Sequence, residues 1–207
     1  MGIPVYIYGK SGSGKSRSMK NFSEDEILLV NVEAKPLPFR SKFKYVLKTD
    51  NIDTIIQQMK KMPCKTAVID DAGYLMTHFF MKHHRNKSGN ASFEMYDNIA
   101  DMMYNLIRDI KTKLPDDVIV YLMLHEDKND YGDVKLLTLG KLLDSKVNLQ
   151  GMVTICLRCM SENGKHFFRT VTDGSDITKA PEEMFSDAEI ENDLKAVDTA
   201  IRESWNL

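Results

Sequence analysis

The octapeptide Gly9–Ser16, GKSGSGKS, directly follows the apolar run VYIY and is the strongest indication of the fold in this sequence. It matches the pattern G-x-x-x-x-G-K-[ST] at each fixed position, through Gly9, Gly14, Lys15 and Ser16. The alternative is a flexible Gly/Ser linker, but a phosphate-binding loop needs a strand before it and a helix after it. PVYIY is a β-rich run and SRSMKNF can begin a helix, so the context favours a phosphate-binding loop.

Each residue type in this loop has a chemical role. The glycines let the backbone curl so that successive N–H groups point at one phosphate, and Lys15 adds a mobile positive charge. Ser16 can offer its hydroxyl to Mg²⁺. We therefore predict ATP and Mg²⁺ as cofactors, with the nucleotide bound by Gly9, Lys10, Ser11, Gly12, Ser13, Gly14, Lys15, Ser16 and Arg17.

Composition limits the class of protein. The 207 residues fit one large domain, and 43% hydrophobic with 28% charged residues argues against wholesale disorder. The formal net charge of −2 excludes a global polycation, so any contact with nucleic acid would use local basic loops. No apolar stretch approaches the roughly 18 residues that span a bilayer, and we expect a protein of the cytoplasm, without a membrane partner.

The cysteines do not predict a metal or redox site. Cys156 and Cys159 form a lone C-x-x-C within MVTICLRCM, an apolar β-like run. Residues three apart in a strand point to opposite faces, so this pair cannot readily bind one metal ion. Reduced thiols in the core are expected instead.

Apolar runs alternate with helical patterns along the chain, which predicts an α/β fold with a mostly parallel central sheet. The expected strands are Val5–Gly9, Ile27–Glu33, Lys44–Leu47, Thr66–Asp70 and Val118–His125. The expected helices are Ile52–Lys61, Ala72–His84 and Phe93–Lys113, the last ended by Pro115.

The pattern changes after His125. DKNDYGDVKLL indicates a hairpin or loop turning at Gly132, and ICLRCMSENGKHFFRTV predicts a hairpin turning at Asn163-Gly164. A final helix is expected to begin near Ser186, which stands in capping-box spacing with Glu189. Its apolar stripe would be Ile190, Leu194, Val197, Ile201 and Trp205. We expect a single domain over 1–207, with the hairpin and helix of about 150–207 as an extension.

A second motif, TAVIDDAG, complements the loop. An apolar strand that ends in an acid describes a Walker B segment, so Asp70 is predicted to hold Mg²⁺ beside the loop's serine. Two acids could polarise the attacking water: Asp71, next in sequence, and Glu33, at the end of ILLVNVE. Both would lie at the carboxyl edge of a parallel sheet, where such folds bind ligands. His125 ends a third strand and could contact the γ-phosphate.

The set GKSGSGKS, LLVNVEAK, AVIDDAG and YLMLHED, in this order, resembles the RecA-like core ATPases of bacteriophages that are associated with single-strand annealing proteins. The resemblance implies a RecA-like P-loop fold and favours Glu33 over Asp71 as the catalytic acid. It implies a γ-phosphate sensor at His125. It also implies that a basic residue late in the chain reaches a neighbour's nucleotide, with Lys179 as the first choice and Arg169 as the second.

The same resemblance suggests where single-stranded DNA would bind. The corresponding loops are KHHRNKSGN, residues 82–90, and EDKNDYGDVK, residues 126–135. The first is basic, whereas the second carries four acidic and two basic residues. The candidate DNA contacts are Lys82, Arg85, Lys87 and Tyr131.

Three functions remain open at this point. The first is a phage ATPase in DNA recombination or replication that acts on single-stranded DNA, or on a DNA-bound partner such as an annealing or single-strand binding protein. The second is a nucleotide-switched loader with slow hydrolysis. The third is a small-molecule P-loop kinase, although the chain lacks an evident arginine-rich lid. A residue that acts in trans would require a homo-oligomeric ring or filament.

Overall fold

The computed structural model describes residues 1–85, 89–140, 143 and 147–207. Its strands are β1 (Ile3–Gly9), β2 (Ile27–Asn31), β3 (Tyr45–Leu47), β4 (Thr66–Asp70), β5 (Ile119–Lys128), β6 (Val134–Leu136), β7 (Ile155–Glu162), β8 (Lys165–Arg169) and β9 (Glu189–Glu191). The helices are η1 (Ser16–Asn21), α1 (Ile52–Met59), α2 (Tyr74–His83), α3 (Asn90–Lys113), η2 (Leu149–Met152) and α5 (Leu194–Trp205), where η marks 3-10 helices.

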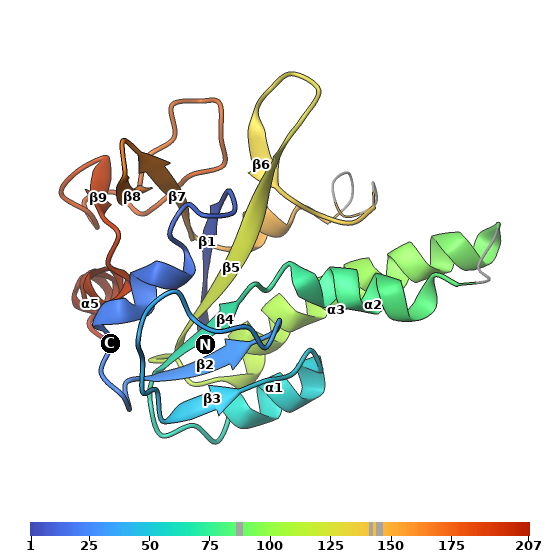
Figure 1. Cartoon of the computed structure of the whole chain (residues 1–207), viewed down its shortest axis with the longest axis horizontal. Coiled ribbons are helices and arrows are strands. Elements are labelled where there is room, and N and C mark those ends of the chain that lie inside the picture. Colours follow the sequence, from blue (N-terminus) through green and yellow to red (C-terminus); the bar gives the residue numbers. More distant parts are fainter. Residues whose placement is uncertain (86–88, 141–142, 144–146) are drawn as a thin grey trace.

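The described strands form one sheet in the order β3-β2-β4-β5-β1-β7-β8-β9 (Figure 1). Pairing is parallel from β3 through β7 and antiparallel from β7 to β9. β6 folds back on the end of β5. The predicted α/β fold with a mostly parallel sheet is confirmed, and β7, β8 and β9 continue this same sheet.

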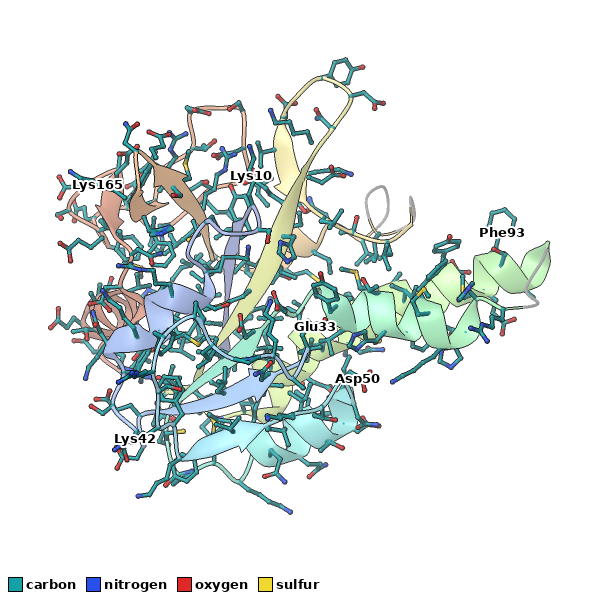
Figure 2. All side chains as sticks on the ribbon, in the orientation of Figure 1. Lys10, Glu33, Lys42, Asp50, Phe93 and Lys165 are labelled. Carbon is teal, nitrogen blue, oxygen red and sulfur yellow. The ribbon has the colours of Figure 1, made fainter. Side chains whose placement is uncertain are left out.

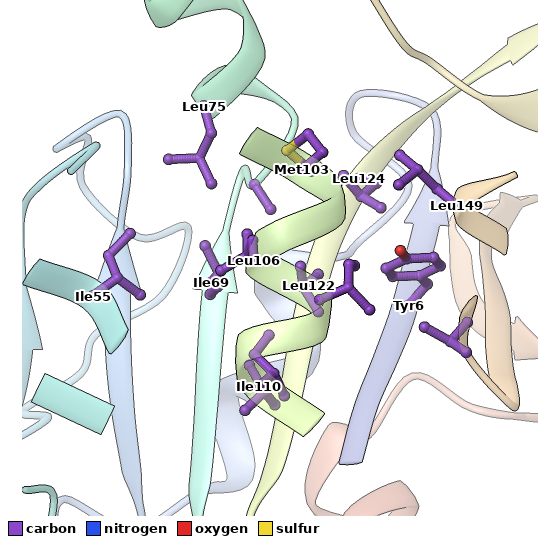
Figure 3. Close-up of a cluster of buried hydrophobic side chains, with 14 of the residues drawn as sticks. Tyr6, Ile55, Ile69, Leu75, Met103, Leu106, Ile110, Leu122, Leu124 and Leu149 are labelled. Atoms are coloured by element: carbon purple, nitrogen blue, oxygen red, sulfur yellow. The ribbon is translucent and has the colours of Figure 1, made fainter. Parts of the chain in front are cut away.

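Both faces of the sheet are buried at its central strands β1, β2, β4 and β5, which explains why these strands are continuous apolar runs. β5 shows the alternation: Val120 and Leu122 face one apolar cluster, while Tyr121 and Met123 face the other. The first cluster lies under α1, α2 and α3, and Figure 3 shows α3 side chains packed over β4 and β5. The second lies under η1 and α5, which contact each other across the opposite face.

The two cysteines of the C-x-x-C pattern confirm this alternation. Cys156 belongs to the apolar cluster under α1, α2 and α3, and Cys159 belongs to the cluster under η1 and α5. Both are free and buried, and burial raises the pKa of the Cys159 thiol to about 11. They therefore act as core residues on opposite faces of β7.

α2 and the first half of α3 run side by side and project from the sheet as an arm (Figure 1). α3 ends at Lys113, and Leu114 is extended because a proline follows it. Within the described part of the chain, no helix has the length and apolar character needed to cross a membrane.

α5 is fixed to the sheet by a buried polar network around Asp198. Its Oδ1 accepts hydrogen bonds from Thr66 Oγ1 at 3.0 Å and Tyr121 OH at 3.1 Å, and its Oδ2 accepts from Arg202 Nε at 2.7 Å. These partners lie near the beginning of β4, in β5 and in α5. We call these four residues the Asp198 network. Its hydrogen bonds compensate for the free energy that burying the Asp198 carboxylate would otherwise cost.

The predicted start of the last helix was wrong. The helix begins at Leu194, because the Asp193 carboxylate accepts hydrogen bonds from the backbone N–H groups of Lys195 and Ala196 and so caps it. Glu189 and Ile190 lie instead in β9, where Ile190 pairs with Phe168. The cap at Asp193 thus lies seven residues after Ser186, where the capping-box pattern predicted the helix to begin.

Two turns decide where other predicted elements end. The strand expected to run to Glu33 stops at Asn31, whose carbonyl accepts a hydrogen bond from Ala34 N in a turn. The hairpin turn at Asn163-Gly164 is confirmed, with φ of 50° and 75°, as a two-residue turn of this kind requires. The phosphate-loop helix is a single short 3-10 segment.

Candidate functional site

The site lies at the carboxyl ends of the parallel strands β1 and β4, beside His125 of β5, a strand that runs on to Lys128 and does not end at His125 as predicted. β5 stands between the other two, with Gly9 opposite His125 and Ile69 opposite Leu122. Parallel strands carry their carboxyl ends to one edge of a sheet, so the loop after β1, the acids after β4 and the histidine on β5 come together. The strand order thus brings together most of the site residues that the sequence motifs predicted.

The loop lysine lies folded over the loop. Lys15 Nζ donates to the carbonyl oxygens of Gly9 and Lys10, each at 2.8 Å, and lies 3.5 Å from His125 Nδ1. The residue is only 6% exposed, and burial lowers the pKa of its ammonium group. A charge held this way can exchange carbonyl partners for phosphate oxygens without crossing bulk water.

Ser16 and Asp70 meet as the two motifs require. Ser16 Oγ donates a hydrogen bond to Asp70 Oδ1 at 2.8 Å. The other carboxylate oxygen, Asp70 Oδ2, is buried and has no hydrogen-bond partner among the described residues. Burial raises the pKa of Asp70, as expected for a carboxylate that lacks a compensating cation.

These two residues fit a magnesium ion. An unpartnered buried carboxylate oxygen beside a serine hydroxyl supplies the hard oxygen ligands that Mg²⁺ prefers. Across the part of the chain that the structure describes, no group of three or more His, Cys, Asp or Glu side chains could hold a metal by itself. The ion would therefore bind through Ser16, Asp70 and the phosphates of a nucleotide, as Mg²⁺ commonly does.

Asp71 points back into the same edge. It forms an ion pair with Lys35 and lies 3.6 Å from His125 Nε2. Burial would raise the pKa of Asp71, but the proximity of His125 and Lys35 outweighs burial and holds this pKa below its usual range. Its φ of 56° is left-handed, a conformation that costs a non-glycine residue roughly 1–2 kcal/mol and that clusters at functional sites.

Glu33 occupies a different place. Its Oε1 lies 2.6 Å from His78 Nε2, and His78 Nδ1 lies 3.0 Å from Asp50 Oδ2. Figure 2 shows Glu33 on the side of the α2–α3 arm, well apart from Lys10 of the phosphate loop. Both nitrogens of His78 therefore face carboxylates, and the glutamate is held toward α2.

A cavity of about 330 Å³ runs along the phosphate loop. Apart from loop residues, its lining includes Lys35, Asp71, His125 and His166, whereas Glu33 does not contribute. The cavity has the size of a small-molecule site. Asp71, one of the two predicted acids, and His125, the predicted sensor, therefore line the same cavity as Lys15.

Sequence patterns did not indicate His166 of β8 and Asn192 after β9, which contact the phosphate loop and the short helix that follows it. His166 Nδ1 lies 2.8 Å from the carbonyl oxygen of Ser13, and Asn192 Oδ1 accepts a hydrogen bond from Arg17 Nη1 at 3.3 Å. A Cβ atom on Gly14 would lie 2.8 Å from His166 Nδ1. The glycine is therefore required by close packing as well as by its φ of 105°.

The residues predicted to act in trans lie in or beside the C-terminal part of the sheet. Lys179 pairs through its backbone N–H and carbonyl with Cys156. Arg169, on β8, forms ion pairs with Asp173 at 2.9 Å and Glu189 at 3.7 Å.

The candidate DNA contacts are spread over two extensions. Lys82 near the end of α2 forms an ion pair with Asp50 at 2.6 Å, and Arg85 is exposed. Tyr131 is 92% exposed in the turn between β5 and β6. Lys87 lies outside the described residues.

Comparison with known proteins agrees with this geometry. The protein family described as AAA domain matches residues 1–181. No curated protein matches the sequence. The match spans the phosphate loop, Asp70 and Asp71 at the end of β4, His125 of β5 and the hairpin of β7 and β8. The chain therefore belongs to the AAA domain family, with a nucleotide-binding domain of the P-loop ATPase type.

Proposed function

We propose that this protein is a Mg²⁺-dependent ATPase of bacteriophage DNA recombination or replication. The observation that carries the ATPase part is the contact between Ser16 and Asp70 beside the loop, with Asp70 Oδ2 left without a hydrogen-bond partner among the residues that the structure describes. The phage assignment is supported by the resemblance of four motifs to phage core ATPases, in the same order along the chain.

In this proposal the loop binds and orients the triphosphate. Lys15 transfers its hydrogen bonds from the two loop carbonyls to phosphate oxygens, and Ser16 and Asp70 hold Mg²⁺. Bound Mg²⁺ neutralises charge that develops on the phosphates. His125, within 3.5 Å of Lys15 Nζ, is placed to report whether a γ-phosphate is present.

Of the two acids, we favour Asp71 for orienting the attacking water. It lines the cavity beside Lys15 and His125, while Glu33 is absent from that lining and is bound by His78. The resemblance favours Glu33 instead, so both remain to be tested. Asp71 must give up its ion pair with Lys35 to act, because a carboxylate neutralised by an ammonium group is a poor base.

Turnover would act on single-stranded DNA or on a DNA-bound protein. A change at His125 or Asp71 can reach the arm, because Tyr74 at the beginning of α2 packs edge-on against His125, with ring centroids 6.0 Å apart. Arg85 and Tyr131 are exposed on the two extensions that would meet a partner. Lys179 and Arg169 would complete a neighbour's site in a ring or filament.

ATP turnover in four variants tests this proposal. We expect Lys15→Ala and Asp70→Asn to lose turnover, and Asp71→Asn to lose more than Glu33→Gln. Full activity in Lys15→Ala would contradict the whole scheme, whereas loss only in Glu33→Gln would move the catalytic acid. Phosphate transfer to a nucleoside monophosphate would favour the kinase.

A nucleotide-switched loader is the second candidate, and one observation favours it. Both acids are held by basic side chains, Asp71 by Lys35 and Glu33 by His78, so neither carboxylate is free to polarise water in this conformation. Hydrolysis would then wait for a partner that breaks one of these contacts. Tight Mg-ATP binding with turnover near background, in the absence of a partner, would support the loader.

A further inference from the structure

The segment between β2 and β3 carries features that the nucleotide site does not explain. Residues 35–44, KPLPFRSKFK, contain four basic residues, two phenylalanines and no acidic residue. We call this stretch the basic segment. Alternating cations and aromatic rings are the composition that single-stranded nucleic acids require of a protein surface.

The basic segment is anchored to the fold and holds its charges outward. Leu37, Phe39 and Phe43 pack against the apolar cluster under η1, and the two phenylalanine rings meet edge-on with centroids 6.2 Å apart. Both rings are only half-buried, and between them Arg40 and Lys42 are exposed. The rings and the charges therefore share one surface, which the packing of the rings attaches to the fold.

A cavity of about 450 Å³ opens on this surface. Lys20 of η1 joins Phe39, Arg40, Lys42 and Phe43 in its lining, and Glu24 also contributes. Within the described ranges of the chain, no ion pair neutralises Lys20, Arg40 or Lys42. The cavity therefore combines unpaired cations with the exposed parts of two aromatic rings, and one acid opposes three bases.

This surface is distinct from the two extensions predicted to meet DNA. Figure 2 shows Lys42 at one edge of the molecule and Phe93, at the tip of the arm, at the other. The basic segment instead adjoins the nucleotide site, because Lys35, Pro36 and Pro38 line the cavity along the phosphate loop. One continuous segment thus contributes to both cavities, with its two prolines restricting the backbone between them.

We propose that the basic segment and Lys20 form a binding site for single-stranded nucleic acid. Lys20, Arg40 and Lys42 contact backbone phosphates, and Phe39 and Phe43 offer their exposed edges and faces to unstacked bases. A consequence that rests on the proposed ATPase function follows from Lys35, which pairs with Asp71. A strand bound to the segment shifts this lysine and so changes ATP turnover.

Fluorescence anisotropy with a labelled single-stranded oligonucleotide, without nucleotide, tests the binding site independently of ATPase activity. Each phosphate contact contributes about 0.7 to the slope of log affinity against log salt, or about fivefold in affinity at about 0.1 M salt. The double variant Arg40→Ala/Lys42→Ala should therefore bind about 25-fold more weakly, with the slope reduced by about 1.4. Phe39→Leu keeps the apolar anchor, and we expect a loss of severalfold with an unchanged melting temperature.

The matched control is Lys60→Ala/Lys61→Ala, which removes the same charge from exposed positions after α1. We expect less than a twofold change. Equal losses in both double variants would show general electrostatics and overturn the site, as would a loss confined to Lys82→Ala/Arg85→Ala. Equal affinity for a duplex with no effect of Phe39→Leu would refute binding through unstacked bases. Binding to anionic vesicles but not to oligonucleotides would also refute the proposal.

The coupling has its own readout. An oligonucleotide should change the turnover of the native protein severalfold, and this ratio should fall to one in Arg40→Ala/Lys42→Ala at the same oligonucleotide concentration. An unaltered ratio in that variant would overturn the coupling. Because anisotropy is measured without nucleotide, absence of ATPase activity would leave the binding result standing and would contradict only the proposed function.

Discussion

Replacing Gly9 by alanine tests whether the phosphate loop is held by direct contact with the C-terminal hairpin. A Cβ atom at this position would lie 2.2 Å from the backbone carbonyl oxygen of Cys159 and 2.8 Å from Ser13 Oγ. Gly9 ends β1, which pairs along its length with β5 and through residues 5–8 with β7. The clash is with backbone, so relief requires one strand of the sheet to move.

The expected cost follows from this geometry. Overpacking a core costs typically 1–3 kcal/mol, and a backbone contact near 2.2 Å belongs at the upper end, about 3 kcal/mol. In a chain of 207 residues, each kcal/mol lowers the melting temperature by roughly 2–4 °C. We therefore expect Gly9→Ala to melt about 6–12 °C lower and to bind nucleotide more weakly.

Gly12→Ala is the matched control in the same loop. A Cβ atom on Gly12 would meet nothing within 4 Å, so the substitution costs only the strain of a φ of 79°. That strain is about 1 kcal/mol, or roughly 2–4 °C. Thermal unfolding followed by circular dichroism compares the two variants. Equal melting temperatures for both would refute the claim that the hairpin packs on the loop.

Three further predictions concern charges at and away from the site. Lys35 and His125 lower the pKa of Asp71 against the effect of burial, so this contact stabilises the fold above about pH 4 and is lost as pH falls through the folded value. Lys35→Met should therefore destabilise at pH 7 by less than about 1 kcal/mol, since this lysine is half-exposed, and this effect should shrink progressively in urea unfolding as the pH falls below about 4; a constant effect would argue against the ion pair. Burial raises the pKa of Asp70, so Mg²⁺-dependent nucleotide affinity should begin to fall on acidification at a higher pH than the ordinary aspartate value of about 3.9 implies, and Asp70→Asn should remove that dependence. Asp198→Ala should cost about 2–4 kcal/mol in denaturant unfolding, because it leaves the buried hydroxyls of Thr66 and Tyr121 without their acceptor, while the half-buried Arg202 keeps its bonds to Asp117, Lys65 and Thr66; a loss under about 1 kcal/mol would show that the Asp198 network is not what holds α5.

Sequence patterns predicted those parts of the fold that depend on local periodicity. Strands buried on both faces, such as Thr66–Asp70, appear as unbroken apolar runs, and their parallel order brings Ser16 and Asp70 together without further information. The residues at which helices and strands begin and end were predicted less accurately. The last helix starts at Leu194 because Asp193 caps it, and nothing in the local pattern ranks this carboxylate above the capping-box residues upstream.

The contacts that the sequence could not predict join residues far apart in the chain. His166 reaches Ser13 across 153 positions, and neither residue stands in a motif that implies the other. Lys35 lies in an irregular stretch, so only the folded chain shows that it pairs with Asp71. The choice between the two acids likewise depends on side-chain direction after a strand, where a turn moves Glu33 toward His78.

The function proposed for this protein requires that the loop Gly9–Ser16 binds a nucleotide and that Lys15 is its charged contact. Isothermal titration with a non-hydrolysable ATP analogue, with and without Mg²⁺, tests this directly. We predict Mg²⁺-dependent binding to the native protein and to Lys60→Ala, and an affinity lower by about tenfold or more in Lys15→Ala, because a charge-assisted hydrogen bond contributes about 1.5–3 kcal/mol. Equal affinities for the native protein and Lys15→Ala would show that Lys15 is not the charged contact of a bound nucleotide.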